Sequence, residues 1–259
     1  MDLGIRGRRA LVTGASKGLG RGCAEALAAA GVDLVINARG AEALEAAAGA
    51  IRAAHGVEVT AVAADIASED GRSAALEAAG GVEILVTNAG GPPPGSWRDW
   101  AREDFQRAIE ANMLTPILLM QAILQGMCDR GWGRVVNITS TSVKAPLASL
   151  GLSNTARAGL TGYVAGVSRQ VAGQGVTINN LLPGTHDTDR IAYLDEQAMA
   201  REGITREEAR ARRRATIPAG RYGTAEEFGA MCAFLCSEQA GYIVGQNIAL
   251  DGGSTNLTL

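Results

Sequence analysis

The sequence predicts an α/β domain: a parallel sheet covered by helices on both faces. Short apolar runs alternate with longer Ala-rich stretches of helical character. The short runs are apolar throughout instead of at every second position, as in strands buried on both sides. With 34 glycines and only 4% aromatic residues, the composition suits tight turns and close helix–sheet packing. The 259 residues contain no repeat and no linker-like run, so we expect a single domain over 1–259.

Each apolar run and each helical stretch can be bounded. The expected strands are Ala10–Thr13, Asp33–Asn37, Glu58–Ala63, Ile84–Thr87, Arg134–Ile138, Thr177–Leu181 and Asn247–Leu250. The expected helices are Leu19–Ala30, Ala41–His55, Glu69–Ala79, Arg102–Arg130, Gly151–Ala172 and Ala225–Ser237. Gly31, Gly56 and Gly175 follow helix ends, where a left-handed residue is favoured.

Two segments interrupt the alternation of strands and helices. Gly90–Gly95 reads GGPPPG, which excludes a helix or a central strand and indicates a stiff loop. His186–Thr216 carries seven arginines among several acidic residues, at helical spacing in places. Such a long insertion after the sixth strand is a candidate lid, at about 186–216, over whatever binds at the strand ends.

Composition excludes several classes of protein. The formal net charge of -3 gives no basic footprint for nucleic acid. The apolar stretch Met113–Met127 contains Thr, Pro and Gln and is too short to span a bilayer, and the N-terminus has no apolar signal core. Four cysteines make no disulfide framework, and two histidines, His55 and His186, indicate no metal cluster. We therefore expect a cytoplasmic protein with no metal site and no membrane partner.

A glycine-rich turn connects the first strand to the first helix. The strand ending at Thr13 runs into the segment Gly14, Ala15, Ser16, Lys17, Gly18, Leu19, Gly20. Its glycines allow a tight turn and close backbone approach, and the helix N-terminus offers free N–H groups to a pyrophosphate. A glycine-rich turn that only packs is the alternative, but the position between strand and helix favours dinucleotide binding.

The spacing Thr-Gly-x-x-x-Gly-x-Gly resembles that of the short-chain dehydrogenase/reductase family. Further segments agree in order along nearly the whole chain: Asp65-Ile66, Asn88-Ala89-Gly90, Asn112, Ser140, Pro183-Gly184 with Thr188, and Asp251-Gly252-Gly253. The resemblance implies one doubly wound Rossmann-type domain with a seven-stranded parallel sheet. It also implies an oxidoreductase that binds its nicotinamide cofactor through the glycine turn and these loops.

The end of the second strand bears on the choice of cofactor. An acidic residue there would bind the ribose 2′-hydroxyl of NAD, but the strand ends Asn37-Ala38-Arg39. Arg39, together with Lys17 in the glycine turn, suits a 2′-phosphate through charge-assisted hydrogen bonds. We therefore expect NADP(H) over NAD(H), with two solvated surface charges as the alternative interpretation.

The family's catalytic pattern is broken at two positions. The resemblance implies Asn112 and Ser140 as catalytic residues, followed by a Tyr and a Lys spaced Tyr-x-x-x-Lys. The chain has Ser153 and Arg157 at those positions. A phenol with a pKa of about 10 can be tuned to donate a proton near neutrality, whereas a serine hydroxyl cannot. Arg157 stays charged, so it can hold ribose hydroxyls but cannot pass on a proton.

Another group could supply the proton. His186 occupies the position at which family members contact the nicotinamide carboxamide, and histidine donates protons near pH 7. A backbone contact with the imidazole turned to solvent is an equal alternative. Lys144, Tyr193 and Tyr222 are weaker candidates, since such residues mostly lie on surfaces or only pack. Tyr163 is nearly three turns from Ser153 and is discounted.

These observations predict an NADP(H)-dependent oxidoreductase that acts on a carbonyl or hydroxyl substrate, with a divergent proton-donating site. The resemblance favours a 3-oxoacyl type of substrate, either a small molecule or one linked to an acyl carrier. One alternative is a dinucleotide-binding protein with little or no carbonyl reduction. Another is a reductase of imines or activated alkenes, which need no tyrosine acid. Family resemblance and the apolar helices 113–127 and 160–171 also predict a homotetramer or homodimer.

Overall fold

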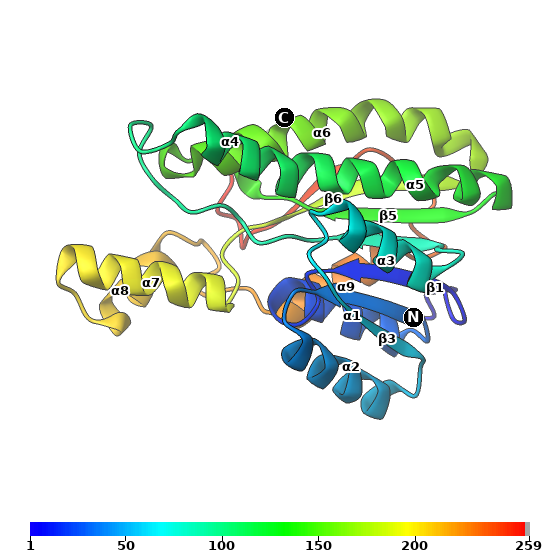
Figure 1. The fold of residues 1–259 in the computed structure, drawn as a ribbon. Coiled ribbons are helices and arrows are strands. Elements are labelled where there is room, and N and C mark those ends of the chain that lie inside the picture. The colour runs from blue at the N-terminus through cyan, green and yellow to red at the C-terminus, as the bar shows by residue number, and fades with distance from the viewer. Residues whose placement is uncertain (257–259) are drawn as a thin grey trace.

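A computed structural model describes residues 1–256 of the chain and has a seven-stranded parallel sheet at its centre (Figure 1). The sheet order is β3-β2-β1-β4-β5-β6-β7. The strands are β1 (Arg9–Thr13), β2 (Asp33–Ala38), β3 (Val59–Ala63), β4 (Ile84–Thr87), β5 (Gly133–Ile138), β6 (Val176–Pro183) and β7 (Asn247–Leu250). The order reverses direction between β1 and β4, and this switch point opens a crevice at the carboxyl ends of the strands. The predicted doubly wound sheet is confirmed.

Helices cover both faces of the sheet. The helices are α1 (Gly18–Ala29), α2 (Ala41–His55), α3 (Glu69–Ala79), α4 (Arg102–Ile109), α5 (Thr115–Arg130), α6 (Gly151–Val171), α7 (Asp189–Glu202), α8 (Arg206–Ala215) and α9 (Ala225–Leu235). One apolar core joins the sheet to α1, α2 and α9. A second core on the opposite face joins it to α3, α5 and α6. Both faces of every central strand are therefore buried, which explains why these strands read as continuous apolar runs.

The predicted helix Arg102–Arg130 is continuous but not α-helical throughout. Residues Glu110–Leu114 form a π-helical turn between α4 and α5. Pro116 explains it, because this residue has no N–H to bond the carbonyl of Asn112 four residues earlier. The other predicted boundaries differ by up to two residues. Gly31, Gly56 and Gly175 have φ values of 83°, 67° and 77°, in agreement with their expected role at helix ends.

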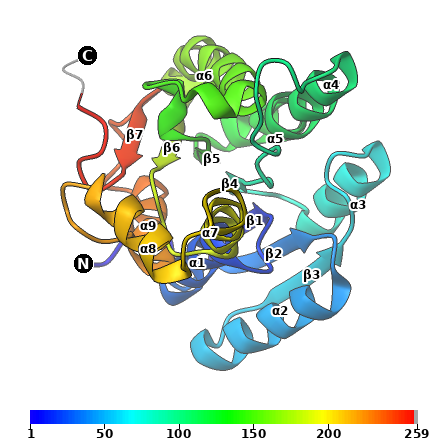
Figure 2. The ribbon, with the colours of Figure 1, turned by 90° about the vertical axis from the view of Figure 1, so that its left-hand side faces the viewer.

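Helices α7 and α8 project from the carboxyl edge of the sheet, where the sequence predicts a lid. They form a pair that stands clear of the main body in Figure 1 and lies in front of the strand ends in Figure 2. A small apolar cluster at their base consists of Ile191, Ile217 and Tyr222. Arginines on α8 pair with acidic residues nearby: Arg213 with Asp195, at 3.0 Å, and Arg212 with Glu202, at 3.1 Å. These ion pairs join α8 to α7.

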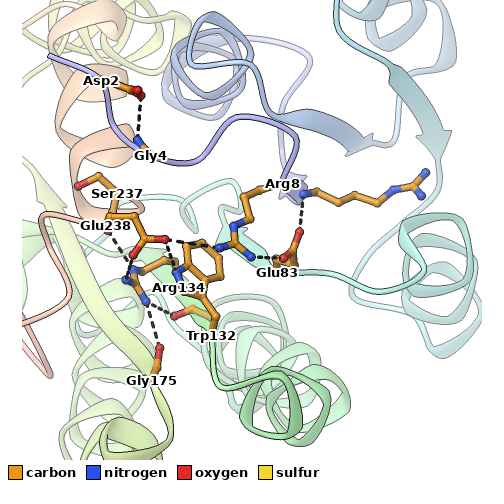
Figure 3. A network of polar contacts seen from close by, with 11 residues as sticks. Asp2, Gly4, Arg8, Glu83, Trp132, Arg134, Gly175, Ser237 and Glu238 are labelled. Carbon is orange, nitrogen blue, oxygen red and sulfur yellow. Dashed lines mark hydrogen bonds and ion pairs between the residues drawn. The ribbon is translucent and has the colours of Figure 1, made fainter.

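A polar network lies at the amino ends of the strands, on the side of the sheet opposite to the carboxyl ends (Figure 3). The buried guanidinium of Arg134 donates to three backbone carbonyls, those of Ser237, Gly133 and Gly175, at 2.9–3.1 Å. The guanidiniums of Arg8 and Arg134 lie 3.9 and 4.5 Å from the ring centroid of Trp132. This network joins the starts of β4 and β5 to the end of α9 and leaves the carboxyl edge to the functional site.

Three further properties concern a membrane-crossing helix, disulfides and metal binding. The stretch Arg102–Arg130 has the length and apolar character of a membrane-crossing helix, but core helices meet the same criterion, and its α5 part packs Leu119, Met120 and Met127 against the sheet. The four cysteines are all unpaired thiols. Within residues 1–256, no three His, Cys, Asp or Glu side chains come together as ligands for a metal ion.

Candidate active site

The glycine-rich turn has a conformation that excludes side chains at its key positions. Gly14 and Gly18 have φ values of 60° and 59°, in the left-handed region. A Cβ on Gly20 would lie 2.3 Å from the carbonyl oxygen of Gly14. Helix α1 begins without a side-chain cap and with no acidic residue in its first turn. The turn therefore leaves a cradle and a helix N-terminus that fit a pyrophosphate.

Asn88 holds the turn from the neighbouring strand end. Its Nδ2 donates to the carbonyl oxygen of Gly14 at 3.1 Å, and its N–H donates to the Thr13 hydroxyl at 2.8 Å. That hydroxyl in turn donates to the carbonyl oxygen of Asn88, also at 2.8 Å. A Cβ on Gly14 would lie 2.7 Å from Asn88 Nδ2, so only glycine permits this approach. The segment Asn88-Ala89-Gly90 thus sets the distance between the ends of β1 and β4.

The end of β2 carries no carboxylate, as the sequence predicts. The Asn37 amide donates to the carbonyls of Val62 and Ala64, at 2.9 and 3.1 Å, so it joins β2 to β3. Arg39 follows and is exposed. Asp65 also faces solvent; its carboxylate accepts from the N–H of Ala67 at 3.1 Å, next to half-buried Ile66. This rim of the crevice therefore presents a free surface cation beside an Asx turn.

Lys17, the second predicted cation, has a partner on the projecting helices. Its ammonium lies 2.7 Å from Asp189 Oδ2, at the first residue of α7. Ser16 and Leu19 on either side are half-buried in the turn. No acid lies near Lys17 along the chain, but the fold brings Asp189 to it from 172 residues away.

Asn112 lies inside the π-helical turn and is 4% exposed. Its side-chain Oδ1 is buried with no hydrogen-bond partner among the described residues. Pro116, four residues later, has no N–H to donate to the backbone carbonyl of Asn112. The spacing Asn-x-x-x-Pro was the available signal for this feature, which was not recognised in the sequence. A buried acceptor beside the strand ends costs free energy unless a ligand or water bonds it.

Ser153 and Arg157 lie one turn apart on α6 and are both buried, at 6% and 7% exposure. Arg157 Nη1 donates to the carbonyl oxygen of Ile138 at 2.7 Å, and its Nη2 lies 3.5 Å from the carbonyl oxygen of Ala89. Arg157 therefore bridges the ends of β5 and β4. Ser140 follows β5, and its hydroxyl accepts from the N–H of Ser142 at 3.1 Å. The tertiary structure brings a fixed cation to the strand ends that carry Ser140 and Asn88.

A small cavity lies between Asn112 and Arg157, and neither Ser140 nor Ser153 lines it. It is lined by residues from β4, the π-helical turn, β5 and α6, including Asn88, Asn112, Ile138 and Arg157. Its volume is about 10 Å³, enough for about one water molecule. Asn112 and Arg157 thus line the same small cavity.

His186 does not join this group. Its ring packs edge-on against Phe228, with centroids 5.1 Å apart, and Nδ1 lies 3.4 Å from the carbonyl oxygen of Gly184. The ring lines a different cavity, of about 370 Å³, together with Arg221, Glu227 and residues after β7. Burial lowers the pKa of His186 below its ordinary value, only partly offset by the Gly184 carbonyl and Glu227. The imidazole does not line the Asn112–Arg157 cavity, and at 4% exposure of the residue it is not turned to solvent either, as the alternative interpretation expected.

The other candidate proton donors also lie elsewhere. Lys144 is exposed at the end of a short 3₁₀ turn, Thr141–Val143. Tyr222 is buried at the base of α7 and α8, and its hydroxyl donates to the carbonyl oxygen of Arg210 at 3.5 Å. Burial raises the pKa of Tyr222, so it is a weaker acid than a free phenol. Tyr193 is 43% exposed on α7. None of these three side chains lines the Asn112–Arg157 cavity.

The segment after β6 leads from the sheet to α7. A Cβ on Gly184 would lie 2.5 Å from Cβ of Asp251, so the Pro183-Gly184 turn packs tightly against the end of β7. Thr188 caps the backbone start of α7, and its hydroxyl lies 3.4 Å from the carbonyl oxygen of His186. A Cβ on Gly18 would lie 3.7 Å from the methyl carbon of Thr188. This segment therefore meets the glycine turn across the crevice.

Comparison with known proteins agrees with this geometry. A family model described as enoyl-(acyl-carrier-protein) reductase matches residues 14–255. The chain is 34% identical to the 3-oxoacyl-[acyl-carrier-protein] reductase of Escherichia coli, over 97% of this chain and 98% of that protein. It is also 34% identical to acetoacetyl-CoA reductase of Cupriavidus necator, over 66% of this chain and 65% of that protein.

A solved structure has the same fold over its whole length. L-sorbose reductase from Gluconobacter frateurii, complexed with NADPH and L-sorbose, superposes with a TM-score of 0.94 at 30% identity. The match covers 99% of this chain and all of that chain. The strand order, the glycine turn and these similarities lead to one conclusion: the chain is an oxidoreductase of the short-chain dehydrogenase/reductase family.

Proposed function

We propose that this enzyme transfers hydride between NADP(H) and a carbonyl or hydroxyl substrate, through a site that lacks the family's tyrosine acid. The cofactor is NADP(H), in line with the NADPH complex of L-sorbose reductase. The cradle formed by Gly14, Gly18 and Gly20 would hold the pyrophosphate, with Lys17 and Arg39 toward the 2′-phosphate. Asp65, Ile66, Asn88, Ala89, Gly90, Pro183, Gly184 and Thr188 would line the remaining cofactor path.

The observation that carries this proposal is that buried Arg157 lines the same cavity as Asn112, with buried Ser153 one turn away on α6. When bound, NADPH supplies the hydride and becomes NADP⁺. The hydroxyls of Ser140 and Ser153 would donate hydrogen bonds to the acceptor oxygen as negative charge develops there. Arg157 would hold the nicotinamide ribose and add a permanent positive charge. The proton that completes the alcohol would come from solvent, because neither Ser153 nor Arg157 can release one near neutral pH.

A second acceptor class is favoured by the positions of the candidate acids. His186 lines a separate cavity, Lys144 and Tyr193 are exposed, and Tyr222 is buried at the base of α7 and α8. An alkene conjugated to a carbonyl needs no strong acid, because hydride adds to the β-carbon and the charge spreads into an enolate. The hydroxyls and Arg157 would stabilise that oxygen, and water would protonate the α-carbon. The enoyl-reductase description of the matching family model supports this candidate.

The substrate is proposed to be a small molecule or an acyl chain linked to a carrier, as in the 3-oxoacyl and acetoacetyl-CoA reductases among its relatives. Helices α7 and α8 are proposed to act as a lid over it. The unpaired thiols of all four cysteines suit a reducing compartment, so we infer a cytoplasmic enzyme.

We also propose that the enzyme is a homotetramer or homodimer. Small residues lie along the exposed side of α6, among them Ala158, Gly162, Ala165 and Gly166. On α5, the side chains of Leu114 and Leu118 are 36% and 38% exposed. These helices could pack closely against their copies across a two-fold axis.

Turnover with labelled cofactor tests the proposal. The enzyme is given NADPH deuterated at the transferred position, with either a 3-oxoacyl or a 2-enoyl thioester. Deuterium on the carbinol carbon supports carbonyl reduction, and deuterium on the β-carbon supports the alkene candidate. Tight NADPH binding without turnover on either thioester, or on a wider panel of ketones, enones and imines, would contradict both. That result would instead support a dinucleotide-binding protein.

A further inference from the structure

A salt bridge crosses the mouth of the glycine-rich turn. Lys17 Nζ lies 2.7 Å from Asp189 Oδ2, and the two side chains are 73% and 74% exposed. Lys17 directly precedes α1, and Asp189 is the first residue of α7. Beside them, Thr188 approaches the position that a Cβ on Gly18 would occupy, at 3.7 Å. The first turn of α7 thus reaches over the N-terminus of α1, where the cofactor's phosphates are expected.

We propose that Asp189 is a specificity-determining residue, which competes with the cofactor's 2′-phosphate for Lys17. This inference rests on the proposed role of Lys17 as a phosphate ligand. While the carboxylate holds the ammonium, Arg39 is the one of the two proposed cationic ligands that remains for the phosphate. Binding of NADPH would move Lys17 from Asp189 to the phosphate, whereas NADH offers no such group. Asp189 therefore reduces the enzyme's preference for NADPH and connects phosphate binding to the start of α7.

Moving the Lys17 ammonium from Asp189 to the cofactor phosphate costs little free energy. Exposed ion pairs of this kind change an equilibrium constant by about one- to fivefold, since water solvates both charges. The ammonium is carried on a flexible four-carbon stem, so it can reach a second anion without moving the backbone. Asp189 keeps a favourable environment when it is released, because its carboxylate remains at the N-terminus of α7. The cofactor phosphate carries more charge than a carboxylate and is the stronger partner.

The matched variants are Asp189→Asn and Asp187→Asn. Both remove one negative charge from the same segment, but Asp187 pairs with Arg210, at 2.8 Å, and not with Lys17. Dissociation constants for NADPH and NADH are measured by cofactor fluorescence without substrate. Asp189→Asn is expected to tighten NADPH binding about two- to fivefold and to change NADH binding by less than twofold. If Asp187→Asn tightens NADPH binding equally, the effect comes from the change in net charge and not from the Lys17–Asp189 pair, which would overturn the proposal.

A double-mutant cycle with Lys17→Ala distinguishes the role of Lys17 as a phosphate ligand from the competition by Asp189. In the Lys17→Ala background, Asp189→Asn is expected to have no effect on NADPH binding. If Lys17→Ala leaves NADPH affinity unchanged, Lys17 is no phosphate ligand and the cofactor proposal itself needs revision at this residue. If Lys17→Ala weakens NADPH binding but Asp189→Asn matches the wild type, only the competition is wrong. Turnover is not measured, so the substrate assignment does not affect the outcome.

Discussion

Arg157 donates from Nη1 to the carbonyl oxygen of Ile138 at 2.7 Å, so the cation of α6 is fixed to the end of β5. A second nitrogen lies 3.5 Å from the carbonyl oxygen of Ala89, at the end of β4. A guanidinium has five donors in one plane, which suits such a bridge between strands. The guanidinium also stays protonated, so Arg157 cannot relay a proton to the substrate. The site must therefore obtain that proton from another source.

Replacing Arg157 by alanine should weaken both the fold and cofactor binding. The carbonyl of Ile138 would be left buried without a donor, at a cost of about 1–3 kcal/mol in the free energy of unfolding. Loss of a charge-assisted contact to the ribose should weaken NADPH binding about ten- to hundredfold. Urea unfolding and fluorescence titration measure the two effects. Arg169→Ala, at an exposed position of the same helix, serves as control. Unchanged NADPH affinity in Arg157→Ala would remove Arg157 from the cofactor site.

Ser153→Ala should lower kcat/KM by less than about tenfold, because Ser140 would still donate a hydrogen bond to the acceptor oxygen and solvent would still supply the proton. Loss of a general acid would cost about 10²–10⁴ in rate. Restoring the family pair with Ser153→Tyr and Arg157→Lys should create or raise activity on simple ketones, provided that the phenol fits the buried position. The measurement is kcat/KM against pH for each variant. A several-hundredfold loss in Ser153→Ala, with NADPH affinity intact, would make Ser153 the working hydroxyl.

Arg39→Asp should shift cofactor preference toward NADH. The change removes a phosphate partner and adds a carboxylate that can accept from a ribose 2′-hydroxyl. We expect NADPH to bind at least about tenfold more weakly and NADH to bind more tightly, as measured by dissociation constants. Arg169→Asp makes the same change of net charge on α6, away from the end of β2. If NADPH still binds as tightly as in the wild type, Arg39 is only a surface charge.

Gly162→Leu should break subunit association without unfolding the subunit. Gly162 is exposed on α6, and a Cβ there would meet nothing within 4 Å inside the chain. A bulky side chain would, however, prevent close approach of α6 from a second copy. Gly49→Leu on α2 is the matched control, since a Cβ there also meets nothing within 4 Å. Light scattering should give a smaller particle for Gly162→Leu alone. A monomeric wild type at micromolar concentration would contradict the proposed assembly.

Glu227 should contribute to the acid sensitivity of the fold. Its bonds to the Arg221 guanidinium and the N–H of Thr224 lower its pKa from 4.5 to about 2. A lowered pKa in the folded state means that the carboxylate stabilises the fold above pH 4.5. This contribution is lost as the pH falls from 4.5 toward about 2. Glu227→Gln should therefore flatten the dependence of unfolding free energy on pH over this range, measured by urea unfolding. A slope equal to that of the wild type would show that other groups carry it.

Much of the fold follows from local patterns in the sequence. The apolar runs and the helical spacing between them depend on residues that are close along the chain, so they predict the seven strands and helices α1, α2, α3, α6 and α9 to within about two residues. Helices α4 and α5 are predicted as one helix, and α7 and α8 only as a charged, lid-like segment. The glycine turn was also predictable, because its conformational demands apply to consecutive residues. The break at Ser153 and Arg157 is visible for the same reason, since both lie on one helix at a fixed spacing. Pro116 signalled the π-helical turn at Asn112, although its meaning is clear only once the helix is seen.

What only the tertiary structure decided is the partner of each functional side chain. The sequence identifies Lys17 as a cation but cannot supply Asp189, which the fold brings from 172 residues away. It identifies His186 as a titratable group after β6, whereas the packing of Phe228 turns the imidazole into a separate cavity. Residue type and spacing determine which chemistry a side chain can perform, because these are local properties. Which groups lie next to the side chain depends on how distant elements pack, and no local sequence pattern contains that information.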